Sequence, residues 1–305
     1  MITDVPSAAE LRERAQGWMS LAWRVVLGAL DSYKAFEDYY LEEGEFTPEE
    51  TDTARQSYWD RSRFNLNNAI SLLQQSLELF LKSFIAEVSP YLLIADEPLR
   101  WKSDAQGNVA FPRLRTVDAS QLCRLVSICT ERSVSDAFKF LYDRLRTHRN
   151  VIVHLGPGNM RVEAEKILAD ILLAHTLLFP NESWVQFRSK TLAGEKYMES
   201  PYSVDWTHSN LMAEVDTALR ALTNGDARRF FGCDKRKRRY VCPTCFSRKT
   251  KYDENDCRYM EGRRDESYCC FVCGTSIGGD DYRTRCTEEV YDSENWQIGV
   301  PGKWR

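Results

Sequence analysis

The segment 69–85 reads Ala-Ile-Ser-Leu-Leu-Gln-Gln-Ser-Leu-Glu-Leu-Phe-Leu-Lys-Ser-Phe-Ile, and it decides the fold class of this chain. Its large apolar residues recur at intervals of three and four, which is the period of an α-helix. They form one broad apolar face, made by Ile70, Leu73, Leu77, Phe80, Leu81 and Phe84. A face of this width is typical of a well-buried helix. We therefore expect a mainly α-helical domain.

The flanking sequence extends the helical pattern in both directions. Thr47-Pro48-Glu49-Glu50 is a strong helix start, because Thr caps, Pro suits the first turn and acids favour the positive helix end. Ser7 with Glu10 forms an earlier capping pair. Residues 95–117 contain Gly and Pro and predict an irregular excursion. Further helices are expected over 7–43, 118–128, 135–154, 162–179 and 210–223, with Asn224-Gly225 closing the last. Residues 181–207 have no clear pattern.

The composition changes after Phe230, where Cys, Arg, Lys, Tyr and Gly become frequent and short β-type runs appear. This change predicts two domains. Residues 1–225 form an all-α domain with its core at about 50–180, and residues 226–305 form a small, β-rich, Cys-rich module.

The whole-chain composition is that of an ordinary globular protein, with 305 residues, 43% hydrophobic and 28% charged. No apolar run approaches the roughly 20 residues that a membrane span needs, and the N-terminus does not resemble a signal peptide. We therefore expect a cytoplasmic protein with no membrane partner. The net charge is -4, yet residues 226–264 hold 13 Lys or Arg against 6 Asp or Glu, so any attraction for a polyanion is local.

Eight of the ten cysteines lie after position 230. Cys242-x-x-Cys245 and Cys270-x-x-Cys273 form two knuckles of the kind found in zinc ribbons, each able to offer two thiolates. In a reducing compartment such crowding favours a metal over disulfides. Four thiolates leave no position for water, so we expect a structural Zn²⁺ and disfavour a zinc enzyme. Roles for Cys233, Cys257, Cys269 and Cys286 stay open.

A basic run precedes the first knuckle, with aromatic residues nearby. It consists of Lys235, Arg236, Lys237, Arg238 and Arg239. Alternating cations and rings are typical of surfaces that bind RNA. A solvated linker or a surface for a protein partner is an equal alternative.

A second polar motif lies at the end of the helix expected over 135–154, in Arg149-Asn150-Val151-Ile152-Val153-His154. The motif resembles the ribonuclease signature of the HEPN superfamily, and its residue types suit the reaction that the resemblance implies. RNA can be cleaved by its own 2′-hydroxyl without a metal, provided that one group moves protons and another stabilises the charged phosphorane. His suits the first task near neutral pH, and Arg suits the second. We assign His154 to acid–base catalysis, Arg149 to phosphate binding, and Asn150 to orienting either group. The alternative to catalysis is a structural role, in which the basic side chains interact favourably with the dipole at the C-terminal end of the helix.

This motif resembles the Arg-Asn-x-x-x-His signature of the HEPN superfamily, and the resemblance covers roughly residues 50–180. Leu77-Glu78-Leu79-Phe80-Leu81-Lys82 resembles the Glu/Lys-bearing first core helix of that family. Glu78 and Lys82 would support the site, and a carboxylate on so apolar a helix needs Arg149 or Lys82 as its partner. The chain departs from the family's toxins that carry Tyr two residues beyond the His.

The resemblance implies a metal-independent endoribonuclease that acts on RNA and leaves 2′,3′-cyclic phosphate ends, in the role of a toxin or anti-phage effector. It also implies a homodimer with a composite site, because residues five apart on a helix point about 140° away from each other. An antitoxin or regulatory protein would be a further partner. The alternative is a non-catalytic interaction or sensor protein that binds nucleic acid or a protein.

Overall fold

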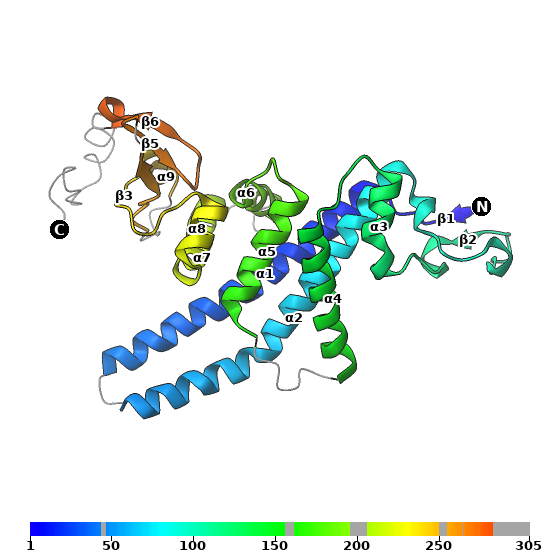
Figure 1. Ribbon diagram of the computed structural model, residues 1–305, viewed down its shortest axis with the longest axis horizontal. Coiled ribbons are helices and arrows are strands. Elements are labelled where there is room, and N and C mark those ends of the chain that lie inside the picture. Colours follow the sequence, from blue (N-terminus) through cyan, green and yellow to red (C-terminus); the bar gives the residue numbers. More distant parts are fainter. Residues whose placement is uncertain (44–46, 156–161, 196–205, 250–254, 264, 283–305) are drawn as a thin grey trace. The chain divides into compact units, whose positions relative to one another are not determined.

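The computed structural model describes residues 1–43, 47–155, 162–195, 206–249, 255–263 and 265–282. The chain separates into two compact units, Met1–Leu178 and Phe179–Arg305. The described part is mainly α-helical, with a small antiparallel sheet in the second unit (Figure 1).

The first unit is built on two long helices, α1 (Ala8–Glu43) and α2 (Pro48–Val88), that lie side by side (Figure 1). Both predicted starts are confirmed. The Glu50 amide donates to Thr47 Oγ1 over 3.3 Å and the Thr47 amide donates to Glu50 Oε2 over 2.8 Å. The same reciprocal pair joins Ser7 and Glu10. These bonds satisfy amides that the first turn would otherwise leave unpaired.

Burial and several inter-helix bonds, two of which reach backbone carbonyls, hold this hairpin together. The six apolar residues that predicted a buried face on α2 are all buried, the most exposed being Ile70 and Phe84 at 3%. On the face toward α1, Ser76 Oγ donates to the Ala15 carbonyl over 2.7 Å and Tyr58 OH to the Ala29 carbonyl over 2.6 Å. These two bonds join the helices at positions several turns apart, so they fix how one helix lies along the other.

Three further helices pack on the hairpin: α3 (Ala119–Cys129), α4 (Asp136–Leu155) and α5 (Ala164–Leu178). The segment between α2 and α3 is irregular, as predicted. It contains short 3₁₀ turns at Pro90–Leu93, Pro98–Arg100 and Phe111–Arg113. Its strand β2 (Val109–Ala110) pairs in parallel with β1 (Ile2–Thr3), which anchors the start of the chain.

The second unit combines helices and the sheet. The helices are α6 (Trp184–Glu195), α7 (Thr207–Ala221), α8 (Asn224–Phe231) and α9 (Pro243–Arg248). The antiparallel strands, in spatial order, are β3 (Arg239–Tyr240), β4 (Met260–Gly262), β5 (Ser267–Cys270) and β6 (Ser276–Gly278).

Contacts between α7 and the segment just before β4 explain why these helices group with the Cys-rich part. Tyr259 OH donates to Asp216 Oδ2 over 2.7 Å, and Cys257 Sγ lies 3.8 Å from Met212 Sδ. The composition placed a boundary at 225/226, whereas the compact units divide at 178/179. The change in composition marks where the cysteines begin, and long-range packing decides where the unit begins.

The expectation that Asn224-Gly225 closes a helix is wrong in one respect. α7 ends at Ala221, and the Asn-Gly pair opens α8 instead. Thr223 caps α8, because its Oγ1 accepts from the Asp226 amide over 3.1 Å. The helix ends at Gly232, whose φ of 69° is a backbone conformation that glycine adopts without strain. The cap residue therefore outweighs the usual turn preference of Asn-Gly.

Within the described ranges, no helix combines the length and the apolar character that crossing a bilayer requires.

Candidate metal centre and the Arg149–His154 helix end

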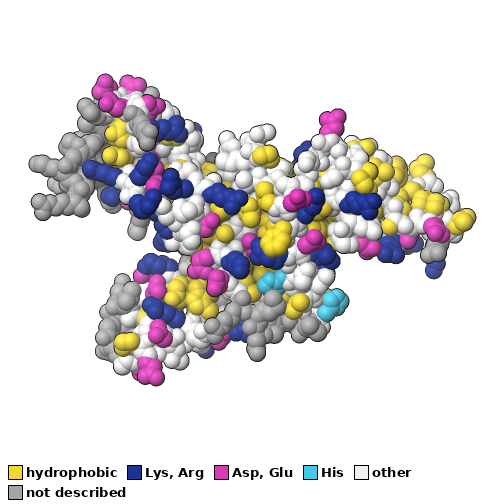
Figure 2. All heavy atoms as spheres, in the orientation of Figure 1, with side chains coloured by type: hydrophobic (Ala, Val, Ile, Leu, Met, Phe, Trp, Pro, Cys, Tyr) yellow, Lys and Arg dark blue, Asp and Glu magenta, His cyan; other side chains and the backbone are white. Residues whose placement is uncertain are grey.

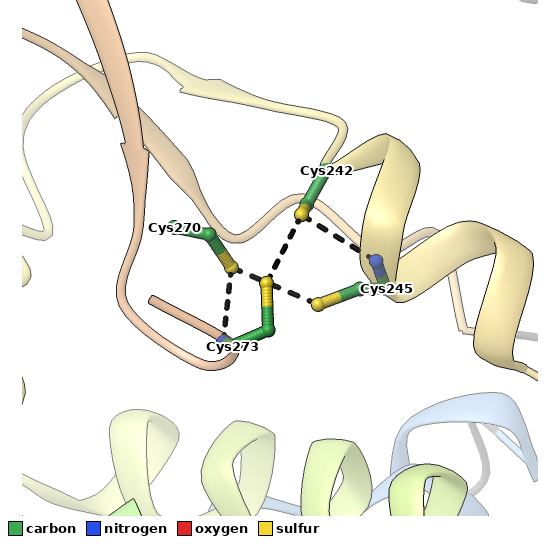
Figure 3. A group of neighbouring side chains, drawn as sticks. All are labelled: Cys242, Cys245, Cys270 and Cys273. Atoms are coloured by element: carbon green, nitrogen blue, oxygen red, sulfur yellow. Dashed lines mark hydrogen bonds between the residues drawn. The ribbon is translucent and has the colours of Figure 1, made fainter. Parts of the chain in front are cut away.

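The four predicted cysteine ligands come together in the second unit. Cys242 caps the start of α9 and Cys245 lies in its first turn, while Cys270 ends β5 and Cys273 lies in the following turn. Figure 3 shows the four side chains pointing toward one another from these two turns. All four sulfur atoms lie within 4.8 Å of one another. The prediction that these cysteines form one cluster is confirmed.

The geometry of the cluster suits a zinc ion. Cys242 Sγ lies 3.5 Å from Cys273 Sγ, and Cys245 Sγ lies 3.7 Å from Cys270 Sγ. Tetrahedral Zn–S bonds of about 2.3 Å require sulfur atoms about 3.8 Å apart. Three of the cysteines are buried and Cys273 is partly exposed. The four thiolates could therefore hold a zinc ion with little movement of the chain.

The two turns are similar. The Cys245 amide lies 3.4 Å from Cys242 Sγ, and the Cys273 amide lies 3.4 Å from Cys270 Sγ. Such amides stabilise the negative charge of a thiolate. After Cys273 the chain turns at Gly274, whose φ of 75° favours glycine.

Hydrogen bonds among the four thiols change their pKa values. The pKa of Cys242 lies below its ordinary value, chiefly because of the hydrogen bond with Cys245, and the pKa of Cys273 is lowered chiefly by Cys242. These two sulfurs therefore give up their protons first. Thr275 Oγ1, which sequence analysis missed, lies 3.0 Å from Cys273 Sγ and can donate to the thiolate.

The other described cysteines of the module, which are Cys233, Cys257 and Cys269, lie outside this cluster. Among the described residues, these four cysteines are the only group of three or more Cys, His, Asp or Glu that could share an ion. Cys233 is fully buried, and burial raises the pKa of its thiol to about 11, which disfavours the thiolate that binds metal. Cys269 belongs to the same strand as Cys270 but to the opposite face of the sheet. Cys286 lies outside the described residues.

The Arg149–His154 motif lies in the last turns of α4, which stays α-helical through Leu155. Arg149 is half-buried, and its Nη1 donates to Asn150 Oδ1 over 3.3 Å. Its Nε is buried and donates to no acceptor among the described residues. The imidazole of His154 is exposed. Since the helix is regular, the two side chains diverge by about 140° within one copy of the chain.

Glu78 pairs with Lys82 rather than with Arg149. Lys82 Nζ lies 2.8 Å from Glu78 Oε1, one helical turn away on α2. Gln74 Nε2 adds a longer hydrogen bond of 3.4 Å to the other carboxylate oxygen. Of the two partners considered for this carboxylate, Lys82 is the one in contact, and the guanidinium of Arg149 is not engaged by it.

His148 lies beside the motif on the face of α4 that meets α5. Burial chiefly lowers its pKa, and the positive charges of Arg144 and Lys166 lower it further, while Asp170 opposes the shift. Arg144 Nη2 lies 2.6 Å from Asp170 Oδ1, so most of that carboxylate's charge is already compensated. His148 is therefore neutral over a wider pH range in the fold than in the unfolded chain.

This shift makes a prediction for stability against pH. A His whose pKa falls on folding stabilises the fold above its unfolded pKa of about 6.5, and the contribution is lost as the pH falls through the folded pKa. We expect the free energy of unfolding to fall more between pH 7 and pH 5 in the wild type than in His148→Gln. Urea unfolding at each pH measures this free energy. The same loss of unfolding free energy between pH 7 and pH 5 in both proteins would contradict the prediction.

Most side chains of the basic run 235–239 form hydrogen bonds or ion pairs with other residues of the second unit. Lys235 Nζ donates to the Leu222 carbonyl over 2.9 Å, which caps the end of α7. Arg236 Nε lies 3.2 Å from Asp234 Oδ1, and Lys237 Nζ lies 3.7 Å from Glu261 Oε2. Figure 2 shows Lys and Arg side chains gathered over α8 and β3. Only Arg238 and Arg239 of the run lie over aromatic rings instead. Tyr252, a nearby ring in the sequence, lies outside the described residues.

No family model, no curated protein and no solved structure is significantly similar to this chain.

Proposed function

We propose that the chain is a metal-independent endoribonuclease of the HEPN type, acting as a toxin or anti-phage effector, whose C-terminal module is a zinc ribbon held by a structural Zn²⁺. The observation that supports it most is the state of the motif. Arg149 is held by Asn150 and free of Glu78, and His154 is exposed at the helix end. The imidazole is therefore open to a phosphate, and the Arg149 guanidinium is not occupied by that carboxylate.

The proposed reaction is an in-line transfer. The 2′-oxygen of RNA forms a bond to phosphorus, and the bond from phosphorus to the 5′-oxygen breaks. A base removes the 2′-hydroxyl proton and an acid protonates the leaving 5′-oxygen, so the products are a 2′,3′-cyclic phosphate and a 5′-hydroxyl. His154 moves protons, while the Arg149 guanidinium stabilises the charge on the phosphorane.

A second copy of the chain completes the site in this proposal. One imidazole cannot be both base and acid in a single step, and Arg149 and His154 diverge on a regular helix. Two α4 ends facing each other across a two-fold axis would supply one imidazole on each side of the phosphate.

Cleavage of RNA by the zinc-loaded chain in buffer without Mg²⁺ tests the proposal. We expect His154→Ala and Arg149→Ala each to reduce the rate by at least about 100-fold, which is the usual effect of losing an acid–base or charge-stabilising group. Arg149→Lys should recover little, because an ammonium lacks the guanidinium fork.

Arg146→Ala is the matched control. It removes an Arg from the same helix that is paired with Asp143, so cleavage should continue. If no RNA is cut, or if the two motif variants cut as fast as the wild type, the motif is structural and the chain is a binding or sensor protein.

A further inference from the structure

Half-buried aromatic rings covered by cations recur in the second unit. Arg238 lies 5.4 Å from the ring centre of Tyr240, and Arg239 lies 5.9 Å from that of Phe271. Arg229 lies 5.2 Å from the ring centre of Phe230, and Lys249 lies 4.8 Å from that of Phe246. Arg and aromatic side chains in alternation give both the charge and the flat surfaces that an unpaired nucleobase requires.

The strand register places two of the rings together. Tyr240 pairs with Met260 across β3 and β4, and Tyr268 pairs with Gly262 across β4 and β5. Met260 and Gly262 are two residues apart and share a face of the sheet, so both tyrosines lie on that face. Their ring centres are 4.9 Å apart at an angle of 75°.

A buried third ring fixes this pair. Tyr282 is only 3% exposed, and its hydroxyl donates to the Val241 carbonyl over 3.0 Å. The Tyr268 ring stacks on it with centres 4.3 Å apart and planes 24° apart. Tyr240 and Tyr268 are therefore held in place by packing, while each residue stays partly exposed.

Tyr268 has a buried cross-strand neighbour, Ile277, on β6, and an open one, Gly262, on β4. Gly262 is exposed and has no side chain, and a Cβ built there would contact the Tyr268 ring at 3.6 Å. Arg238 is exposed beside Tyr240 with no carboxylate paired to it among the described residues, unlike Arg236 and Lys237. Within the described ranges, Arg238 is therefore the guanidinium of the basic run that lies at this face without a carboxylate beside it.

We propose that the Tyr240–Tyr268 face, with Arg238, binds single-stranded RNA by stacking unpaired bases on the two rings and pairing Arg238 with a phosphate. The inference rests on RNA being the substrate of the proposed function, and it assigns the C-terminal module to holding that substrate. A duplex cannot bind in the same way, because its bases are already stacked within the helix.

Fluorescence anisotropy with a labelled 12-nucleotide 2′-O-methyl RNA tests this, since a blocked 2′-oxygen prevents cleavage. We expect Tyr240→Ala and Tyr268→Ala to weaken binding by about 5- to 150-fold each, the effect of losing one stacked base. Tyr240→Phe should bind like the wild type, because it keeps the ring. Tyr91→Ala, which removes an exposed tyrosine from the first unit, should change nothing.

Arg238→Ala is a second variant that does not depend on core packing. It should reduce the slope of log affinity against log salt by about 1. Zinc content reports whether each variant has kept its fold. If Tyr240→Ala and Arg238→Ala retain zinc and bind like the wild type, the inference is overturned. Equal competition by duplex RNA would overturn it too.

The outcome is separable from that of the ribonuclease. RNA cutting that depends on His154, with binding indifferent to Tyr240, overturns this inference alone. Binding that is lost in Tyr240→Ala, in a chain that cuts no RNA, supports this inference and overturns the ribonuclease.

Discussion

Chelation of zinc from the four-cysteine site is expected to unfold the C-terminal sheet. The strands are two to four residues long, too short to bury a core of their own. In small zinc modules the metal contributes about 10–16 kcal/mol of apparent binding free energy at pH 7, and that free energy is also free energy of folding. A chelator should therefore abolish the hydrogen-exchange protection of β3–β6. Protection that survives a metal-free preparation would show that packing alone holds the sheet.

Single cysteine substitutions separate metal binding from general damage. Cys270→Ser removes a ligand, and we expect the variant to lose its zinc. Cys269→Ser is the matched control, because its side chain lies on the opposite face of the same strand. It should keep the metal content of the wild type. If Cys269→Ser loses zinc as readily as Cys270→Ser, the ligand set differs from the one inferred here.

Replacing Arg188 with Ala is expected to cost the second unit about 3–5 kcal/mol, the usual effect of breaking a buried ion pair. The Arg188 side chain on α6 is fully buried and makes a two-pronged bond with Glu214 on α7. Its Nε donates to Oε2 over 2.8 Å and its Nη2 to Oε1 over 2.6 Å. Without the guanidinium, the largely buried carboxylate loses the two charge-assisted bonds that compensate its charge.

The double variant Arg188→Met/Glu214→Leu distinguishes pairing from packing. Removing both charges leaves no buried ion, so the loss should be smaller than in Arg188→Ala by about 2 kcal/mol or more. Urea unfolding of zinc-saturated protein, followed by circular dichroism, measures both. A double variant as unstable as Arg188→Ala would mean that side-chain volume, and not charge, matters at this position.

Local signals in the sequence predicted much of the helical fold. The capping residues Thr47 and Glu50 and the apolar period of 69–85 act within one or two turns, so they locate α2 without knowledge of the rest. α6 has weak apolar periodicity, because a charged residue, Arg188, is buried on it and pairs with Glu214, which is 26 residues away. The division at 178/179 depends on contacts between α7 and residues 257–259, which no local pattern reports.

The candidate sites follow the same rule. Two Cys-x-x-Cys knuckles specify a four-sulfur cluster by spacing alone, because each turn orients its own pair. The sequence left the partner of Glu78 open between Lys82, one turn away on the same helix, and Arg149, on another helix. Only the packed structure shows that the partner is Lys82. Tyr268 was missed because its contacts with Tyr240 and Tyr282 depend on strand register.

The contact between α7 and the segment before β4 has a consequence for the order of synthesis. The chain leaves the ribosome from its N-terminus, so α7 is complete before Cys270 and Cys273 have been made. Until residues 257–259 have emerged, the surface of α7 around Met212 and Asp216 that meets Cys257 and Tyr259 lacks these contacts. If the proposed zinc ion is what holds this segment in place, translation under zinc starvation would leave that face of α7 exposed, and the nascent chain open to aggregation and proteolysis.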